Sequence, residues 1–178
     1  LKIYISYQTH HNMKTLTEKE AEEFLEKEKF KVVKRSIIKN KKDIEKVKIK
    51  FPWVMKVSSK KIMHKAKIGG IKLNINSIEE AEEAYTELSK IENFENILVQ
   101  EMLNGEELII GLKKTPEFGL ALMFGKGGTN VEKEKDIAFR ILPLTKEDIK
   151  EIVKEPRFYK ILEEKNTNLK LLEENIEK

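Results

Sequence analysis

A single histidine in the middle of the sequence is surrounded by basic residues. His64 is the one histidine apart from the adjacent pair His10 and His11. Five lysines lie in the same stretch, residues 54–70: Lys56, Lys60, Lys61, Lys65 and Lys67. Ammonium groups favour the neutral, nucleophilic form of an imidazole and also stabilise a dianionic phosphoryl group attached to it. The pattern indicates a histidine that carries a phosphoryl group, with an ordinary exposed loop histidine as the alternative.

The segment around His64 also has the residue types of an anion-binding loop. It begins at Ser58, after an apolar strand that contains Lys56, and it ends at Gly69-Gly70. A lysine in an interior strand must reach a cleft or find a partner. Consecutive glycines let backbone N–H groups fold over phosphate oxygens. We therefore expect a phosphate contact here; an edge-strand lysine facing water and an ordinary turn are the alternatives.

A second glycine-rich segment precedes two acids. Three glycines within residues 125–128 demand a tight turn, and Glu132 and Asp136 follow it. Mg²⁺ prefers one or two carboxylates together with phosphate oxygens, so both acids are candidate ligands if the chain turns between them. A charged hairpin tip is the alternative.

Arg140, in the apolar run 138–142, is expected to point into a cleft as a bidentate phosphate clamp.

Positive charge is concentrated in one part of the 178-residue chain, whose net charge is +4. From Lys46 to Ile78, both included, there are nine lysines and no acidic residue. Such a field suits a polyanion: nucleotide phosphates, coenzyme A or nucleic acid, with a solvated basic face as the alternative. Nucleic-acid binding calls for aromatic side chains among the lysines. The two that qualify, Phe51 and Trp53, are expected in the core.

The composition excludes several classes of protein. The absence of cysteine removes disulfides, thiol catalysis and thiolate metal sites, and three histidines do not suit a zinc site. Hydrophobic content of 39% supports a packed core. No apolar run is long enough for a membrane span and no signal-peptide pattern is present, so we expect a cytoplasmic protein.

The helices and strands that must position these residues alternate in the first part of the chain, and strands cluster around residues 97–142. Capping boxes predict helices that begin after Thr17, Ser77 and Thr145, and an amphipathic helix is expected after Phe158. Strands are expected over residues 31–38, 53–57, 71–75, 97–102, 107–112, 120–124 and 137–142. This order favours an α+β fold of two lobes. The expected divisions are an N-terminal extension (1–14), a first lobe (15–95), a second lobe (96–155) and a C-terminal helix (156–178).

In order and spacing, several segments resemble the ATP-grasp domain of ADP-forming acyl-CoA synthetases. The similar segments are Leu16-Thr-Glu with Glu20-Ala, Val54-Met-Lys, His64-Lys with Gly69-Gly-Ile, Gly105-x-Glu-Leu-Ile-Ile-Gly111, Pro116-x-Phe-Gly119, Met123-Phe-Gly-x-Gly-Gly128, Glu132, Asp136 and Phe139-Arg-x-x-Pro143. The resemblance covers residues 15 to 155.

This resemblance implies an ATP-grasp fold with nucleotide held in a cleft between two α+β lobes. It implies ATP or ADP and Mg²⁺ as cofactors, a companion CoA-binding α chain, and the conversion of acyl-CoA, ADP and phosphate into acid, CoA and ATP. His64 would pass a phosphoryl group to ADP, while Glu132 and Asp136 would hold Mg²⁺. The residues that would line the cleft are Lys56, Ser58, Lys65, Gly69, Gly70, Glu101, Glu107, Gly127, Gly128 and Arg140.

Other functions stay open beside this ligase. A different ATP-grasp ligase, such as a succinyl-CoA-synthetase relative, would use the same groups. A nucleotide-binding or regulatory module without turnover is a second alternative, because Lys67 stands where the family has an acidic residue and because the C-terminal helix (156–178) is expected to be diverged or truncated relative to the family. A nucleic-acid-binding domain that uses the basic zone from Lys46 to Lys72 is the third.

Overall fold

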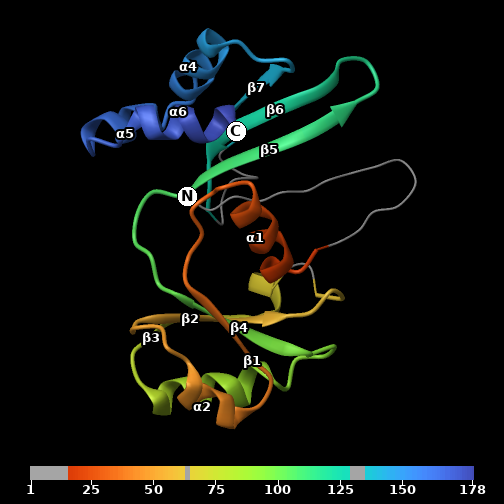
Figure 1. Ribbon diagram of the computed structural model, residues 1–178, viewed down its shortest axis with the longest axis vertical. Helices are drawn as coiled ribbons and strands as arrows, with labels where there is room; N and C mark the ends of the chain where they lie inside the picture. Colours follow the sequence, from red (N-terminus) through yellow and green to blue (C-terminus); the bar gives the residue numbers. More distant parts are fainter. Residues whose placement is uncertain (1–15, 63–64, 129–134) are drawn as a thin grey trace. The chain divides into compact units, whose positions relative to one another are not determined.

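The computed structural model describes residues 16–62, 65–128 and 135–178 (Figure 1). The chain divides between Asn104 and Gly105 into two compact units. We call residues 16–104 the first unit and residues 105–178 the second unit, and describe each by itself. His64 and Glu132 lie outside the described residues.

An antiparallel sheet forms the centre of the first unit. Its four strands within the described residues follow the order β1 (Arg35–Ile38), β4 (Asn96–Glu101), β2 (Trp53–Ser58) and β3 (Ile71–Ile75). All six residues of β2 are buried, which requires cover on both faces of the sheet. Side chains alternate along a strand, so Trp53, Met55 and Val57 face one side while Val54, Lys56 and Ser58 face the other.

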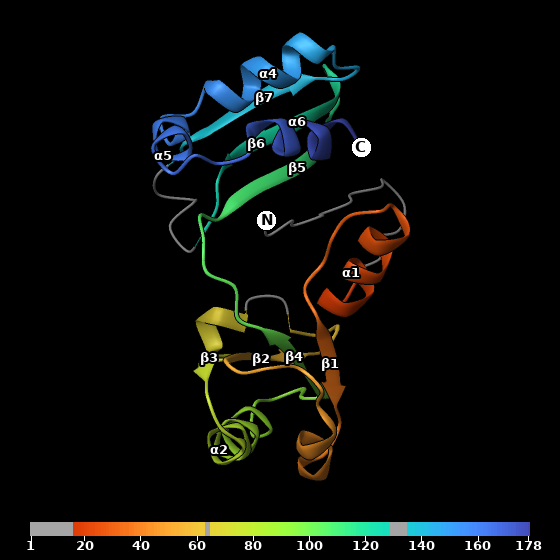
Figure 2. The ribbon, with the colours of Figure 1, turned by 60° about the vertical axis from the view of Figure 1, so that its left-hand side comes forward.

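The apolar face of this sheet packs on helix α2 (Ile78–Leu88) and the 3₁₀ helix η1 (Lys41–Lys46) (Figure 2). Ser77 caps α2 by accepting a hydrogen bond from the Glu80 backbone N–H. The core residues on this side are Ile38, Ile44, Trp53, Met55, Val57, Ile75, Ala81, Ala84, Leu88, Ile97 and Val99. Burial of these side chains supplies the main driving force for folding of the unit.

Helix α1 (Glu18–Lys27) lies on the opposite face of the same sheet (Figure 1). The expected capping box is present: the Glu20 N–H donates to Thr17 Oγ1 at 3.3 Å, and the Thr17 N–H donates to Glu20 Oε2 at 2.7 Å. Leu25 is the one buried side chain of the helix, and Phe24 is 48% exposed. Contacts between α1 and the sheet are therefore mostly polar.

The second unit is a three-stranded antiparallel meander within the described residues. Strands β5 (Leu108–Thr115), β6 (Gly119–Lys126) and β7 (Ile137–Ile141) pair in sequence order. Helices α4 (Lys146–Lys154), α5 (Tyr159–Glu164) and α6 (Leu169–Glu177) accompany it (Figure 2). Its core consists of Leu108, Leu122, Phe124, Ala138, Ile152, Val153, Phe158, Leu162 and Leu172.

The observed boundaries differ from the expected ones in three places. Strand β4 pairs with β1 and β2, so the division falls after residue 104 instead of residue 95. The C-terminal segment 156–178 packs into the core of the second unit and forms two helices, with Asn166 at a positive φ of 50° between them. The expected strand 31–38 is restricted to β1. No helix in the described part of the chain has the length and apolarity to cross a membrane.

Candidate functional site

Lys56 has a buried ammonium group that is held by one carboxylate. The residue lies in β2 between β3 and β4, so the edge-strand alternative is excluded. Only 8% of it is exposed, and its Nζ lies 2.5 Å from Oε1 of Glu18 in α1. A buried charge requires such a partner, since desolvation without one costs several kcal/mol.

A second lysine reaches the same carboxylate. Lys65 begins the 3₁₀ helix η2 (Lys65–Ile68), and its Nζ lies 3.1 Å from Oε2 of Glu18. Burial raises the pKa of Glu18, but the charges of Lys56 and Lys65 outweigh it and hold that pKa below its usual 4.5. Lys60 pairs with Glu20 of the same helix at 3.0 Å. Two of the predicted phosphate ligands, Lys56 and Lys65, are therefore brought together on Glu18.

The next turn of α1 holds a second partly buried acid, Glu22. Oε1 of Glu22 accepts a hydrogen bond of 2.6 Å from Nε2 of Gln100, and its Oε2 lies 3.5 Å from Nε of Arg35. Burial and the charge of Glu18 raise the pKa of Glu22 to about 7, although Arg35 and Lys56 oppose that shift. The face of the sheet under α1 is thus a connected set of charged and polar groups.

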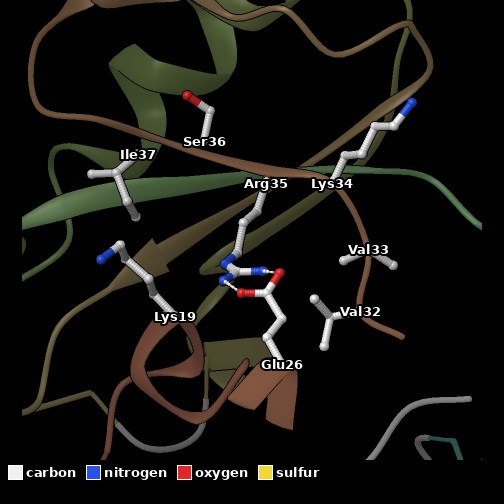
Figure 3. A pocket seen from close by; sticks show the side chains of 8 residues that line it. All are labelled: Lys19, Glu26, Val32, Val33, Lys34, Arg35, Ser36 and Ile37. Carbon is white, nitrogen blue, oxygen red and sulfur yellow. Dashed lines mark hydrogen bonds and ion pairs between the residues drawn. The ribbon is translucent and has the colours of Figure 1, made fainter. Parts of the chain in front are cut away.

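Arg35 also forms a planar pair with Glu26, one turn beyond Glu22 on the helix (Figure 3). Its Nη1 and Nη2 donate to Oε1 and Oε2 of Glu26 at 2.9 and 2.5 Å. The pair lies beside an open depression of about 430 Å³ along β1, lined by Lys19, Glu26, Val32, Val33, Lys34, Arg35, Ser36 and Ile37. None of the site residues that the sequence predicts lines this depression.

The Gly69-Gly70 pair forms a tight turn into β3. Gly69 has φ +69°, and a Cβ on Gly70 would lie 3.0 Å from the Lys65 carbonyl oxygen. The Gly70 N–H donates to that oxygen at 2.7 Å, and the Gly69 N–H donates to the Ala66 carbonyl at 3.4 Å. An anion bound by this turn would have to replace those bonds.

Ser58 and Glu101 are each the last residue of a strand, and because β2 and β4 are antiparallel they lie at opposite ends of this strand pair. Ser58 is buried on the Lys56 side of β2, opposite Asn96. Glu101 ends β4, and its Oε1 accepts a hydrogen bond of 3.2 Å from the Lys34 backbone N–H. Their predicted contact with nucleotide stays a prediction.

The second unit brings Glu107 next to the two glycines at the end of β6. The Gly127 N–H donates to the Glu107 carbonyl at 2.6 Å, and a Cβ on Gly127 would lie 2.9 Å from the Glu107 carbonyl carbon. Gly128 has φ +100°, and a Cβ there would lie 3.3 Å from Oε2 of Glu107. The absence of side chains at these glycines lets the turn approach Glu107 closely.

Asp136 and Arg140 are engaged by groups other than those expected. The two carboxylate oxygens of Asp136 accept hydrogen bonds from the backbone N–H groups of Arg157 (2.8 Å) and Phe158 (2.9 Å). Arg140 lies opposite Leu122 on the helix-covered face of the sheet, and its Nη1 donates to Oε2 of Glu155 at 2.7 Å. In the structure this guanidinium therefore holds an acid beyond α4, where the sequence predicts a phosphate clamp in a cleft.

The described residues do not by themselves fit a Mg²⁺ site. No group of three His, Asp or Glu side chains within them could hold a metal ion. Asp136 already accepts two N–H donors, and Glu132 lies outside the described residues. The assignment of both acids to Mg²⁺ stays a prediction, and no chemical step is routed through the ion.

Sequence reasoning missed Glu18, Glu22, Gln100 and Arg35 as members of this cluster. A signal was available: acids at positions 18, 22 and 26 recur every four residues and so share one face of the helix. A helix face of acids beside a lysine-rich loop predicts ion pairing between the two.

Comparison with known proteins identifies the fold. The family model for the ATP-grasp domain matches residues 8–178, which extends the resemblance past residue 155 to the end of the chain. The two α+β units therefore form an ATP-grasp domain.

Named relatives narrow that class. The β subunit of acetate–CoA ligase [ADP-forming] I from Pyrococcus furiosus is 38% identical over 177 residues, which are 92% of this chain and 76% of the relative. Acetate–CoA ligase [ADP-forming] II from Archaeoglobus fulgidus is 40% identical over 151 residues, but the chain spans only 22% of its length. The chain therefore belongs to the ATP-grasp family, among the relatives of the ADP-forming acetate–CoA ligase β subunit.

A solved structure agrees with this placement. The dinucleotide-forming acetyl-coenzyme A synthetase 1 of Ca. Korarchaeum cryptofilum, in complex with coenzyme A, Ca-AMPCP and HgCl⁺, superposes with a TM-score of 0.75 at 38% identity. The match covers 83% of this chain and 69% of that chain.

Proposed function

We propose that this chain is the nucleotide-binding part of an ADP-forming acyl-CoA synthetase and works with a companion CoA-binding α chain. The observation that carries the proposal is the convergence of the ammonium groups of Lys56 and Lys65 on one partly buried carboxylate, that of Glu18. Two lysines aimed at one point supply the charge that phosphate oxygens require. The relatives named above are ligases of this kind, and one is itself called a β subunit.

In this proposal His64 carries the phosphoryl group. A β-phosphate oxygen of ADP attacks the phosphorus of phosphorylated His64, the P–N bond breaks as the P–O bond forms, and the released imidazole nitrogen takes up a proton. Lys65, its neighbour in sequence, and Lys56 offset the negative charge that collects between the two phosphates. A related structure of the Korarchaeum enzyme, 40% identical, is described with Mg-AMPPCP and with its phosphohistidine segment pointing towards the nucleotide binding site.

The cofactors in this proposal are ATP or ADP with Mg²⁺, and the substrate is a short-chain acyl group such as acetyl. When bound, Mg²⁺ would neutralise phosphate oxygens; Glu132 and Asp136 are the predicted ligands. Of the other predicted lining residues, Glu107 lies against the glycines that follow β6, which supports a contact between its carboxylate and a ligand group that approaches this turn.

Phosphoryl labelling tests the proposal. Incubation with γ-labelled ATP and Mg²⁺ should label the chain with a phosphate that is lost in acid and retained in base, as a phosphorylated imidazole requires. The label should disappear in His64→Asn and persist in His11→Asn, which changes a histidine outside the proposed chemistry. Labelling that persists in His64→Asn would contradict the proposed carrier.

A nucleotide-binding module without turnover is the second candidate. The observation that favours it is the engagement of Asp136 and Arg140 by Phe158 and Glu155, which leaves neither group directed at a ligand in this structure. Such a module would bind MgADP but would not become labelled. Co-expression with the α chain of a relative separates the two, because only the synthetase gains ATP formation from acyl-CoA, ADP and phosphate.

A further inference from the structure

Helix α1 is attached to the first unit by charge more than by apolar packing. Glu18 binds Lys56 and Lys65, and Glu20 binds Lys60. Further along the helix, Glu22 binds Gln100 and Glu26 binds Arg35. Ion pairs whose partners can find other anions are easier to exchange than a buried apolar face, so this attachment is suited to replacement by a ligand.

We propose that Glu18 is an internal substitute for a nucleotide phosphate. Its carboxylate binds Lys56 and Lys65 in the nucleotide-free protein, and a phosphate group displaces the carboxylate when nucleotide binds. The proposal rests on the proposed function, since it concerns the same phosphate site. It makes Glu18 a positioning residue that also sets how tightly the site binds anions.

The geometry around Glu18 matches what a phosphate would experience. Each oxygen of the carboxylate receives one ammonium group, at 2.5 Å from Lys56 and 3.1 Å from Lys65. Two oxygens of a phosphate can receive the same two donors. Two cations and one carboxylate leave a net charge of about +1, which a phosphate group with nearly two negative charges would neutralise more completely.

The side chain of Glu18 can also move away from the two lysines. It is the first residue of α1, and its side chain is 26% exposed while that of Lys56 is 9% exposed. The carboxylate can therefore rotate towards water, or α1 can lift at its first turn, while Lys56 stays fixed in the sheet. A nucleotide that bound without moving Glu18 would place like charges side by side, which disfavours that arrangement.

A binding comparison tests the proposal. Isothermal titration of pyrophosphate and of MgADP into the full chain should give a Kd about tenfold lower for Glu18→Gln than for the wild-type protein, because the lysines are freed from an internal competitor. Glu23→Gln, on the exposed side of the same helix, is the matched control and should leave Kd unchanged. A tighter Kd in Glu18→Gln for both probes supports the proposal.

The outcomes separate this proposal from the function on which it rests. Suppose that the wild type binds the probes, that Lys56→Ala does not, and that Glu18→Gln binds as tightly as the wild type or more weakly. The phosphate site then stands and the proposed role of Glu18 is overturned. If neither the wild type nor Glu18→Gln binds either probe, both proposals fail.

A second measurement needs no variant and so does not depend on the folding of Glu18→Gln. Hydrogen exchange of the α1 amides, residues 18–27, should become several-fold faster when MgADP saturates the protein, because the ion pairs that hold the first turn are lost. Exchange that is unchanged or slower at saturation would overturn the proposal.

Discussion

Glu18 places one carboxylate oxygen 2.5 Å from the ammonium nitrogen of Lys56, and this pair joins the first turn of α1 to the centre of the sheet. The two residues are 38 positions apart in the sequence. Their contact fixes a buried positive charge on the face of β2 opposite the apolar core. The same face carries Gln100 and Arg35, so charged and polar groups lie between helix and sheet beside the buried apolar side chains of Val54 and Leu98.

The partly buried acid Glu22 should make the stability of the first unit depend on pH. Its pKa is about 7 in the folded chain against an ordinary 4.5, so the folded state binds the proton more tightly and loses this stabilisation as pH rises through 7. The groups that face it are Glu18, Arg35, Lys56 and Gln100. Glu22→Gln should raise the free energy of unfolding at pH 8, relative to pH 5, by about 1 to 2 kcal/mol after allowance for solvent screening.

Urea unfolding of both proteins at the two pH values measures this difference. Glu23→Gln, on the exposed side of α1, serves as the control and should change little between pH 5 and pH 8. Equal pH dependence in the wild type and Glu22→Gln would show that Glu22 does not hold a proton in the folded chain.

Asp136 should stabilise the second unit even without any ligand. Its oxygens accept the Arg157 and Phe158 backbone N–H groups that precede α5, and Asp136→Ala leaves both donors without that acceptor. The loss should lower the free energy of unfolding by about 2 to 3 kcal/mol. Asp136→Asn keeps one acceptor oxygen and should lose about half as much.

Thermal or urea unfolding of the nucleotide-free, metal-free protein checks this prediction. A residue whose whole role is to bind Mg²⁺ would leave that stability unchanged when replaced by alanine. Unchanged unfolding in Asp136→Ala would therefore reject a capping role for this carboxylate.

Gly125 should tolerate no side chain, because β6 and β7 approach closely there. A Cβ at this position would lie 2.5 Å from the Asp136 carbonyl oxygen and 2.5 Å from Cγ2 of Ile137. Gly125→Ala should therefore cost about 3 kcal/mol or more of unfolding free energy. Gly119→Ala is the matched comparison: its φ is +73° with open space around it, so only a backbone cost of about 1 to 2 kcal/mol is expected.

Denaturant unfolding of the two variants compares these costs directly. Equal losses at Gly125 and Gly119 would mean that close strand approach is not what requires glycine at position 125.

Local features of the fold could be predicted from the sequence. The capping boxes at Thr17 and Thr145 begin α1 and α4 as expected, and strand 71–75 is β3. These signals are local, because a capping side chain and its donor lie three residues apart. The α+β class follows from the order of the predicted helices and strands, and the ATP-grasp family follows from the order and spacing of the motifs; the comparisons confirm both.

Features that depend on distant pairing could not be predicted in the same way. The sequence predicts β4 as a strand but does not show that it pairs with β1 and β2. The expected boundary between the units therefore falls at residue 95, and the observed one falls after residue 104. The Glu18–Lys56 contact likewise depends on how α1 lies across the sheet. By contrast, the break between α5 and α6 had a local signal, since Asn166 adopts a positive φ and Asn168 caps α6.

The most direct test of the phosphate site is calorimetric titration of MgADP into the wild type, Lys56→Ala and the control Lys42→Ala, which alters an exposed lysine of η1. We expect saturable binding to the wild type and to Lys42→Ala. Lys56→Ala should bind roughly thirtyfold more weakly, the equivalent of about 2 kcal/mol for one lost charge-assisted contact. Equal affinities for all three folded proteins would contradict the assignment of Lys56 and its neighbours to the phosphate site.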